Sequence, residues 1–467
     1  MDSTLACLAA WMPRQRWYAA KGRPPSLRLV AWWDPPRATA DGDATDELQA
    51  PRVRTFLVAD EGSLPPVLYQ IPVVSRATAT VDASAAHIIG SPEPGTTFID
   101  GPFDPAYSDA LLALVTDGGE GQGPHSVATG HPTHSLPVEG TRTAAVLTGE
   151  QSNTSLIYRA DDGSMPIICK VFRQLHPGLN PDIELQTALA DAGSPHVPRA
   201  IGSVEGTWPD LATAQGTVSG SLAFAQEFLP GVEDAWRVAL SAAAQGEDFR
   251  GPARALGAAT ADVHVSLAQL FPTRVTRAED RASTAATWRR RLAIAIAEVP
   301  AIADRREAIE AVYDRAVDVA WPPLQRIHGD YHLGQVLQVP DRGWVLLDFE
   351  GEPLRPMAER LSVDLPLRDV AGMLRSFDYV AGSIRLDHPD RSAEAVRDWA
   401  LAARRSFIEG YSSASGAELD VESALLAALE LDKAVYEAIY ESRNRPTWVS
   451  IPLRAISRLV EKPAAVS

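Results

Sequence analysis

The sequence predicts an α+β fold in which a β-rich N-terminal half precedes a mostly helical C-terminal half. Apolar runs of strand length concentrate in the first half. After Pro230 the composition shifts toward Ala, Leu, Arg and Glu, and apolar residues recur at helical spacing. A helix is also expected from Asn180, because Asn is a favoured N-cap and Pro181 suits the first helical turn. The expected strands are 27–33, 67–74, 143–147, 156–158 and 167–172, and the clearest helical patterns lie in 256–270 and 425–440.

Length and charge narrow the class of protein. The chain has 467 residues, which suits two or three structural units, and its hydrophobic content of 45% is enough to form a core. It carries 43 Lys and Arg against 60 Asp and Glu, a net charge of −17. A surface of that sign disfavours binding to phosphate backbones, so we expect no nucleic-acid partner.

Cysteine content and hydropathy indicate the compartment. Cys7 and Cys169 are the two cysteines, too few for a disulfide framework or a Cys-rich zinc site. Asp2 stands where a secretory signal would carry positive charge, and no run of about 18 apolar residues occurs. We therefore expect a cytoplasmic protein with no membrane partner.

Three stretches differ in composition from the rest of the chain. Residues 34–47 are rich in Ala, Asp and Pro and are expected to form an exposed loop. Residues 117–140 hold Gly and Pro at a density that predicts a linker or long surface loop rather than a regular element. Residues 202–221 are also glycine-rich and lead into an apolar run.

The most informative stretch is 327–352. Asp330 is followed five residues later by Gln335, and then, after a short apolar β run at 345–347, by Asp348. Phosphoryl transfer from ATP needs a carboxylate that orients and deprotonates the acceptor hydroxyl, and amide and carboxylate oxygens that hold Mg²⁺. These three residues supply those groups in the order that kinase-like folds use.

Two other interpretations of this stretch compete with the kinase one. His328 and His332 are spaced like a zinc pair, but Gly329 interrupts a helix there and no third soft ligand lies nearby. Asp330 directly after a glycine is also typical of an ordinary turn. The conjunction with the amide and the second carboxylate favours the kinase interpretation.

Eight segments spread over nearly the whole chain form a recognisable array. They are 11–18, 149–155, 170–173, 180–184, 327–352, 366–372, 431–437 and 443–446. Together they resemble the actinobacterial maltokinases and glucosamine kinases, which share the fold of aminoglycoside phosphotransferases and eukaryotic-like kinases. The resemblance implies a bilobal protein-kinase-like fold with an N-terminal β-rich cap subdomain and a mostly helical C-lobe. It implies a cap at 1–90, an N-lobe with nucleotide-binding strands at 91–225, and a C-lobe with the catalytic and sugar-binding residues at 226–467.

The same resemblance implies an ATP site with Mg²⁺. Lys170 looks like the lysine that contacts the α- and β-phosphates, and Glu184 is similar to the helix glutamate that pairs with it. Asp330 is then the catalytic base, while Gln335 and Asp348 hold the metal. A loop of hydroxyl and amide side chains and a hinge segment complete the implied nucleotide site: Ser152, Asn153, Thr154, Gln226 and Phe228.

Sugar sites combine hydrogen-bonding polar groups with an aromatic ring under the pyranose face. The candidates behind the catalytic loop are His332, Glu352, Asp369, Tyr440, Glu441, Arg445 and Trp448. The competing interpretation is structural, because Arg368 and Asp369 suit a salt bridge and Tyr436 and Tyr440, four residues apart, suit a helical core face.

We expect a small-molecule sugar acceptor and a monomer, with an oligomer left open. Glucosamine, phosphorylated on its 6-hydroxyl, is favoured over maltose, phosphorylated on its anomeric hydroxyl, because an ammonium group calls for carboxylate partners. The short stretch between 231–236 and 246–249 also departs from the maltokinase pattern. A nucleotide-binding pseudokinase is the non-enzyme alternative, disfavoured because the kinase residues are all present.

Overall fold

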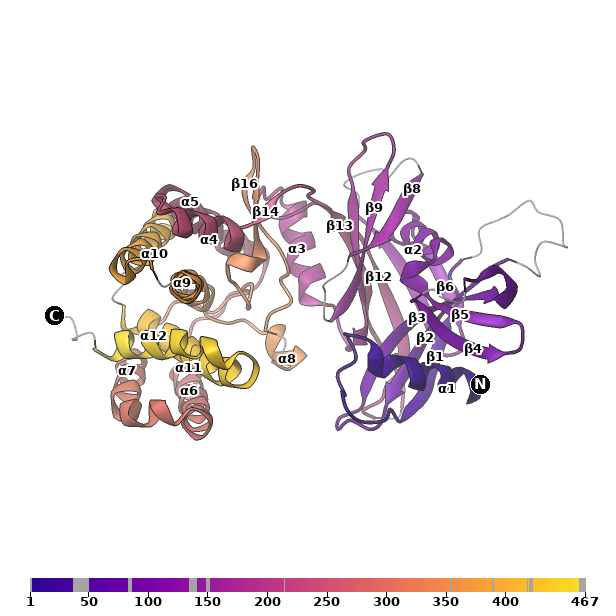
Figure 1. The fold of residues 1–467 in the computed structure, drawn as a ribbon, viewed down its shortest axis with the longest axis horizontal. Coiled ribbons are helices and arrows are strands. Elements are labelled where there is room, and N and C mark those ends of the chain that lie inside the picture. Colours follow the sequence, from indigo (N-terminus) through magenta and orange to yellow (C-terminus); the bar gives the residue numbers. More distant parts are fainter. Residues whose placement is uncertain are drawn as a thin grey trace. The chain divides into compact units, whose positions relative to one another are not determined.

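The computed structural model describes residues 2–36, 50–82, 86–133, 141–147, 152–213, 215–352, 355–388, 390–417, 419 and 423–461. The chain divides into two compact units, Met1–Thr187 with Pro198–Pro230 and Ala188–Val197 with Gly231–Ser467. The first unit is rich in strands and the second in helices, which confirms the predicted fold class (Figure 1). The predicted three-part division stays a prediction, and the predicted loop at 34–47 lies almost wholly outside the described residues.

A six-stranded antiparallel sheet begins the first unit. In spatial order its main strands are β1 (Leu27–Trp33), β2 (Arg52–Asp60), β3 (Val67–Ala77), β5 (Thr96–Asp100) and β4 (Ile88–Glu93), and β11 (Gln174–Leu175) pairs with β3. Helix α1 (Asp2–Trp11) and the 3₁₀ turn η1 (Met12–Arg14) join its core. The rings of Trp11 and Tyr69 each lie within 5.7 Å of the Trp17 ring, which anchors the N-terminal segment by aromatic burial.

A second antiparallel sheet has seven strands. In spatial order these are β6 (Gly119–Gly123), β7 (Ser126–Pro132), β12 (Ala200–Pro209), β13 (Thr217–Glu227), β10 (Ile167–Phe172), β9 (Asn153–Ala160) and β8 (Arg142–Val146). Helix α2 (Pro105–Asp117) begins with Asp104, whose carboxylate caps it by accepting from the Ala106 N–H. The 3₁₀ turns η2 (Thr78–Thr80) and η3 (Gly101–Phe103) complete the connections.

The predicted linker at 117–140 is wrong for its described part, which forms the β6–β7 hairpin. The glycines there serve close packing rather than a loop. A Cβ on Gly123 would lie 1.8 Å from the Trp32 carbonyl oxygen, and one on Gly130 would lie 1.8 Å from the Leu114 carbonyl oxygen. Strands β12 and β13 likewise run through most of the glycine-rich stretch 202–221.

Helix α3 (Pro181–Asp191) begins where the sequence predicts it. The Asn180 side-chain oxygen accepts from the Asp182 N–H at 2.8 Å, which satisfies one of the unpaired donors of the first turn. The chain passes from the first unit to the second immediately after Pro230, at the end of the predicted hinge segment.

The second unit is a helical assembly. Its helices are α4 (Ala235–Gln245), α5 (Arg250–Leu270), α6 (Ala278–Glu298), α7 (Arg306–Asp318), α8 (Met357–Arg360), α9 (Leu367–Asp387), α10 (Ala393–Ser415), α11 (Ala424–Asn444) and α12 (Ser450–Glu461), with 3₁₀ turns η4 (Pro300–Arg305), η5 (Leu333–Gln335) and η6 (Pro446–Trp448). Helix α9 is its most buried long element, with apolar residues on much of its surface. Within the described part of the chain, no helix is long and apolar enough to cross a membrane.

Helices α5 and α10 pack along each other at close range. A Cβ on Gly257 of α5 would lie 2.0 Å from the Phe407 carbonyl oxygen, and one on Gly410 of α10 would lie 2.0 Å from the Arg254 carbonyl oxygen. Each glycine therefore allows one backbone to approach the other.

A small antiparallel sheet carries the segment of greatest interest. It consists of β14 (Glu233–Asp234), β15 (Val336–Val339) and β16 (Gly343–Leu346). Buried apolar residues fix β16 in place, and the chain leaves it directly into the segment that holds Asp348. The predicted apolar run before that carboxylate is confirmed.

Candidate active site

Asp369 anchors the loop that presents Asp330. Both oxygens of the Asp369 carboxylate accept backbone hydrogen bonds, from the His328 N–H at 2.8 Å and from the Gly329 N–H at 2.9 Å. The His264 ring Nε2 lies 3.0 Å from the same carboxylate. Asp369 is only 1% exposed and its oxygens hold the loop, so a contact with a sugar stays a prediction.

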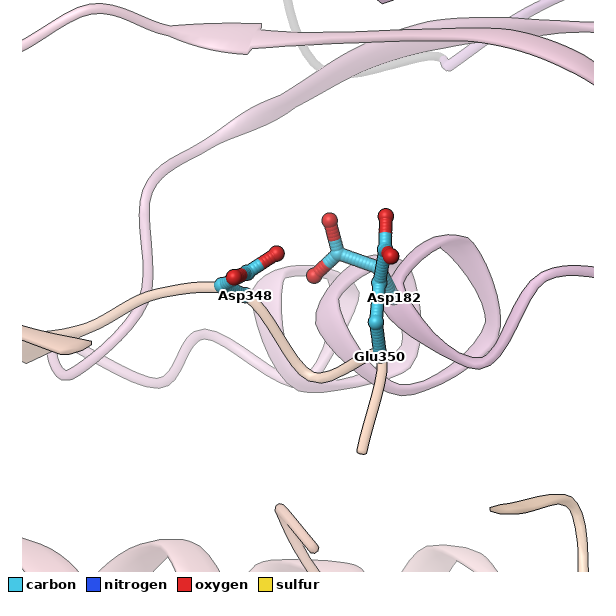
Figure 2. A group of neighbouring side chains, drawn as sticks. All are labelled: Asp182, Asp348 and Glu350. Carbon is cyan, nitrogen blue, oxygen red and sulfur yellow. The ribbon is translucent and has the colours of Figure 1, made fainter. Parts of the chain in front are cut away.

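The side chains of Gln335 and Asp348 contact each other. The Gln335 Nε2 donates to Asp348 Oδ2 at 3.0 Å, and Asp348 adopts a φ of +67°, a conformation that non-glycine residues rarely adopt. Glu350, which the sequence analysis missed, lies on the same segment with a carboxylate oxygen within 4.8 Å of one from Asp348 (Figure 2). Carboxylate and amide oxygens are the donors that Mg²⁺ prefers, so this set fits the expected metal.

Lys433 of α11 lies beside the predicted catalytic base. Its ammonium group is 3.6 Å from Asp330 and forms a salt bridge with Glu352, which also pairs with Arg355 at 3.2 Å. Burial opposes the charge on Lys433, but Glu352 and Asp330 raise its pKa. Burial likewise opposes the charge on Glu352, but Lys433 and Arg355 lower its pKa to about 2. The carboxylate of Glu352 pairs with these two cations, and its contact with a sugar stays a prediction.

A cavity of about 400 Å³ opens next to this loop, entirely within the second unit. It brings together five of the predicted sugar-binding residues: His332, Tyr440, Glu441, Arg445 and Trp448. Lys433 also lines it, which connects the cavity to Asp330. Asp234 and Trp236 also line it and were not predicted, because an acid before a helix is an ordinary N-cap, and Asp234 does accept from the Arg237 N–H at the start of α4.

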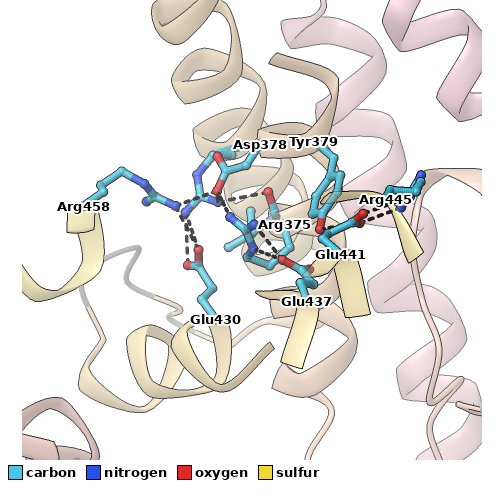
Figure 3. A network of polar contacts seen from close by, with 10 residues as sticks. Arg375, Asp378, Tyr379, Glu430, Glu437, Glu441, Arg445 and Arg458 are labelled. Carbon is cyan, nitrogen blue, oxygen red and sulfur yellow. Dashed lines mark hydrogen bonds and ion pairs between the residues drawn. The ribbon is translucent and has the colours of Figure 1, made fainter. Parts of the chain in front are cut away.

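One wall of the cavity is a buried network of charges (Figure 3). Glu441 accepts from the Tyr379 hydroxyl at 3.0 Å and pairs with Arg445 at 2.6 Å. Glu437 pairs with Arg375 at 2.7 Å, although burial raises the pKa of that carboxyl. These pairings fix the positions of the side chains that line the cavity.

Aromatic rings supply the apolar part of the cavity. The Tyr379 and Trp448 rings stack with centroids 6.3 Å apart, and the Arg445 guanidinium lies 4.6 Å from the Trp448 ring centroid. Tyr440 is 43% exposed and Tyr436 also lines the cavity, so neither is the core residue that the structural interpretation requires. Aromatic faces and carboxylates together suit a sugar ring.

The predicted phosphate-binding lysine lies in the first unit. Lys170 on β10 pairs with Asp182 at 2.8 Å, and Asp182 is fully buried. Figure 2 shows Asp182 on α3, in the first turn of that helix. Sequence analysis named Glu184 as the partner and missed Asp182, two residues earlier on the same helix. The pairing with Glu184 stays a prediction.

The other predicted nucleotide-binding residues lie at the ends of strands in the same unit. Thr154 is buried and its hydroxyl accepts from Arg173 Nε at 2.8 Å, and its contact with a nucleotide stays a prediction. Gln226 is buried and accepts from the Gln186 amide. The remaining three are an exposed Ser152, Asn153 at the first position of β9, and Phe228, whose N–H donates to the Pro166 oxygen at 2.8 Å.

Comparison with known proteins identifies the class to which this fold and site belong. Residues 143–411 match the phosphotransferase enzyme family, and residues 11–104 match the maltokinase N-terminal cap domain. The chain belongs to the phosphotransferase enzyme family. This match confirms the predicted family and the predicted class of enzyme, a sugar phosphotransferase.

Individual relatives show which members of the family this chain is similar to. A glucosamine kinase of Streptacidiphilus jiangxiensis is 32% identical over 388 residues, which cover 75% of this chain and 85% of that protein. A glucosamine kinase of Mycolicibacterium smegmatis is 30% identical over 50% of this chain and 62% of its own. A solved structure of a glucosamine kinase in complex with glucosamine, ADP and inorganic phosphate covers 97% of this chain and 98% of its own, with 25% identity and a TM-score of 0.66.

Proposed function

We propose that this protein is an ATP-dependent kinase that transfers the γ-phosphoryl group to the 6-hydroxyl of glucosamine. The observation that carries the proposal is the cavity beside Asp330, with aromatic rings and the carboxylates of Asp234, Glu437 and Glu441 in its lining. A protonated amino sugar needs both kinds of group, since the rings cover its apolar face and a carboxylate attracts its ammonium group. The resemblance to two glucosamine kinases supports the same substrate.

In this proposal Asp330 is the catalytic base. It orients the acceptor hydroxyl and takes its proton as the oxygen–phosphorus bond forms, while ADP leaves with the electrons of the broken bond. The Lys433 ammonium lies 3.6 Å from Asp330 and helps to hold its carboxylate in position. The hydrogen bonds from the loop to Asp369 keep the base in position.

Gln335 and Asp348 are the proposed ligands of Mg²⁺, with Glu350 as a third oxygen donor on the same segment. Bound there, the metal neutralises charge on the phosphate oxygens. The unusual backbone conformation of Asp348 aims its carboxylate at the Gln335 amide, so both side chains are oriented in advance.

Lys170 is the proposed phosphate-binding cation of the first unit. Its salt bridge with Asp182 fixes the position of the ammonium group, because the strand β10 and the helix α3 hold the backbone of both residues. Asn153, Ser152 and the hinge residue Phe228 are proposed to contact the nucleotide through polar and backbone groups.

Maltose is the second candidate acceptor. The match of residues 11–104 to the maltokinase N-terminal cap domain is the observation that keeps it a candidate. Maltose has no cationic group, so its recognition would depend on the aromatic rings of the cavity and on neutral hydrogen bonds.

The deciding experiment measures ADP release with ATP, Mg²⁺ and glucosamine, maltose, glucose or an aminoglycoside. We expect turnover with glucosamine and much slower turnover with glucose, which differs from it only in the group at C2. Asp234→Asn and Glu441→Gln, which each remove one cavity carboxylate, are expected to raise the KM for glucosamine and to leave that for ATP unchanged. Turnover with maltose alone would overturn the choice of acceptor, and nucleotide binding without turnover would indicate a pseudokinase.

A further inference from the structure

A second cavity in the C-terminal unit carries an excess of positive charge. It has a volume of about 560 Å³ and is formed by α9, α10 and α12. Four arginines line it, Arg385, Arg397, Arg454 and Arg458, against two acids, Asp378 and Glu461. Such a cavity stands out in a chain whose net charge is −17.

The acids in the lining do not balance these arginines. Asp378 already accepts from Arg458 at 2.7 Å and from Arg375 at 2.6 Å, and Arg404 lies 3.4 Å away (Figure 3). Burial opposes the charge on Asp378, yet the three guanidinium groups lower its pKa to about 2. This carboxylate is therefore shared among cations and cannot neutralise a further one.

Arg385 and Arg454 are the two cations left over. Neither has an ion pair or side-chain hydrogen bond with any residue in the described part of the chain. Both line the same cavity, and burial followed by the charge of Arg385 lowers the pKa of Arg454. Two like charges at one cavity repel each other, and an anion placed between them removes that cost.

We propose that this cavity binds a phosphate group, either free or attached to a small organic molecule. A phosphate group carries up to two negative charges and matches the forked donors of two guanidinium groups. Leu401 and Ile451 also line the cavity, so it offers an apolar surface for the organic part of the ligand. Its volume lies in the range of small-molecule sites. The site is separate from the sugar cavity and does not depend on the proposed function.

Two sources share this chemistry: inorganic phosphate, and a sugar phosphate such as the product of a sugar kinase. Calorimetric titration without ATP tests both, with inorganic phosphate in one arm and glucosamine 6-phosphate in the other, at constant ionic strength. Unphosphorylated glucosamine is titrated in parallel and measures how much binding the proposed sugar cavity contributes, in the wild type and in the variant below. We expect a binding event with at least one of the two phosphate compounds, and stronger binding of the sugar phosphate if the apolar lining contributes.

The double variant Arg385→Ala/Arg454→Ala is expected to weaken that event at least tenfold. Both side chains are exposed and unpaired within the described residues, so the variant should fold as the wild type does. The matched control Arg290→Ala/Arg306→Ala removes two exposed arginines from α6 and α7 and should bind as the wild type does. Arg454→Glu, which reverses one charge, provides a second test and should abolish binding.

Three outcomes would overturn the proposal: no binding by the wild type, equal affinity in the Arg385/Arg454 variant, or an equal loss in the control. Equal affinity would place the phosphate elsewhere in the molecule, and an equal loss would mean general attraction to net charge. The Arg385/Arg454 variant separates the two sites, because it removes binding at this cavity and leaves any product or phosphate binding at the proposed active site unchanged.

Discussion

The charged side chains on the two sides of helix α9 differ in whether the protein itself supplies partners for all of them. On the side of the catalytic loop, Asp369 is buried and satisfied by two backbone N–H groups and a histidine ring. On the side of α10 and α12, Asp378 is shared among three arginines while Arg385 and Arg454 have no partner within the described residues. One side is completed by the protein itself, and the other is completed, in our proposal, by a ligand.

The difference shows what each arrangement is suited to do. A fully satisfied carboxylate under a loop holds backbone atoms at fixed positions, as a catalytic base requires. Unpaired guanidinium groups at an open cavity keep their hydrogen-bonding capacity for an incoming anion. Arg375 spans the two sides, because it contacts both Asp378 and Glu437, and Glu437 lines the sugar cavity.

Removing the charge of the base should have the largest effect. Asp330→Asn keeps the size of the side chain but cannot accept the proton, so we expect kcat to fall about 10³-fold, or about 4 kcal/mol. The check is ADP release with glucosamine, with nucleotide affinity measured in parallel and expected to stay within threefold. Asp314→Asn, an exposed carboxylate on α7, is the control. Full activity in Asp330→Asn would contradict the assignment of the base.

Local patterns predicted the regular elements and the order of the catalytic residues. The strand β10, the capped start of α3 and the spacing of Asp330, Gln335 and Asp348 all depend on neighbours within about 20 residues. The β6–β7 hairpin was not predicted, because its glycines are required by close contacts with segments that are distant in the sequence. One such contact is with the Trp32 carbonyl oxygen.

The sugar site shows the same limit. Asp369 and Glu352 were predicted as sugar contacts because carboxylates near a catalytic loop suit that role. Within the folded chain they also have protein partners far along the sequence, at Gly329, 40 residues from Asp369, and at Lys433, 81 residues from Glu352. Only the folded chain shows which carboxylates are already engaged.

Asp369→Asn should disturb the catalytic side without removing the base. The amide has one acceptor oxygen instead of two, so a buried N–H of His328 or Gly329 loses its partner, at a cost of about 2–3 kcal/mol. We expect a lower urea midpoint and a fall in kcat with an unchanged KM for ATP. Asp387→Asn, on the exposed end of the same helix, is the control and should match the wild type. A stable, fully active Asp369→Asn variant would show that the loop needs no such anchor.

Gly257→Ala should disturb the packing of α5 against α10. Its Cβ would lie 2.0 Å from the Phe407 carbonyl oxygen, so α10 must move away, at a cost of about 1–3 kcal/mol. Gly251→Ala in the same helix meets nothing within 4 Å and should stabilise the protein by up to about 1 kcal/mol through helix propensity. Urea unfolding of both variants measures the difference. Equal stability of the two would mean that α5 and α10 do not pack as closely as described.

The smallest effect concerns the acid limb of the stability curve, where Asp378 titrates. Its pKa, about 2 in the folded protein, lies below the ordinary 3.8, so its ionised form stabilises the fold above about pH 4. That contribution is lost as the pH falls from about 4 toward 2. In Asp378→Asn the arginines lose their shared anion, so stability at neutral pH falls, while the curves of variant and wild type converge at low pH. Urea unfolding from pH 7 to pH 2 measures the free energy of unfolding of both proteins. Its slope against pH should be steeper in the wild type than in the variant, by at most about 1.4 kcal/mol per pH unit, the limit for one proton. Parallel curves across this range would mean that Asp378 does not titrate with folding, and the three arginines would then need another source of neutralisation.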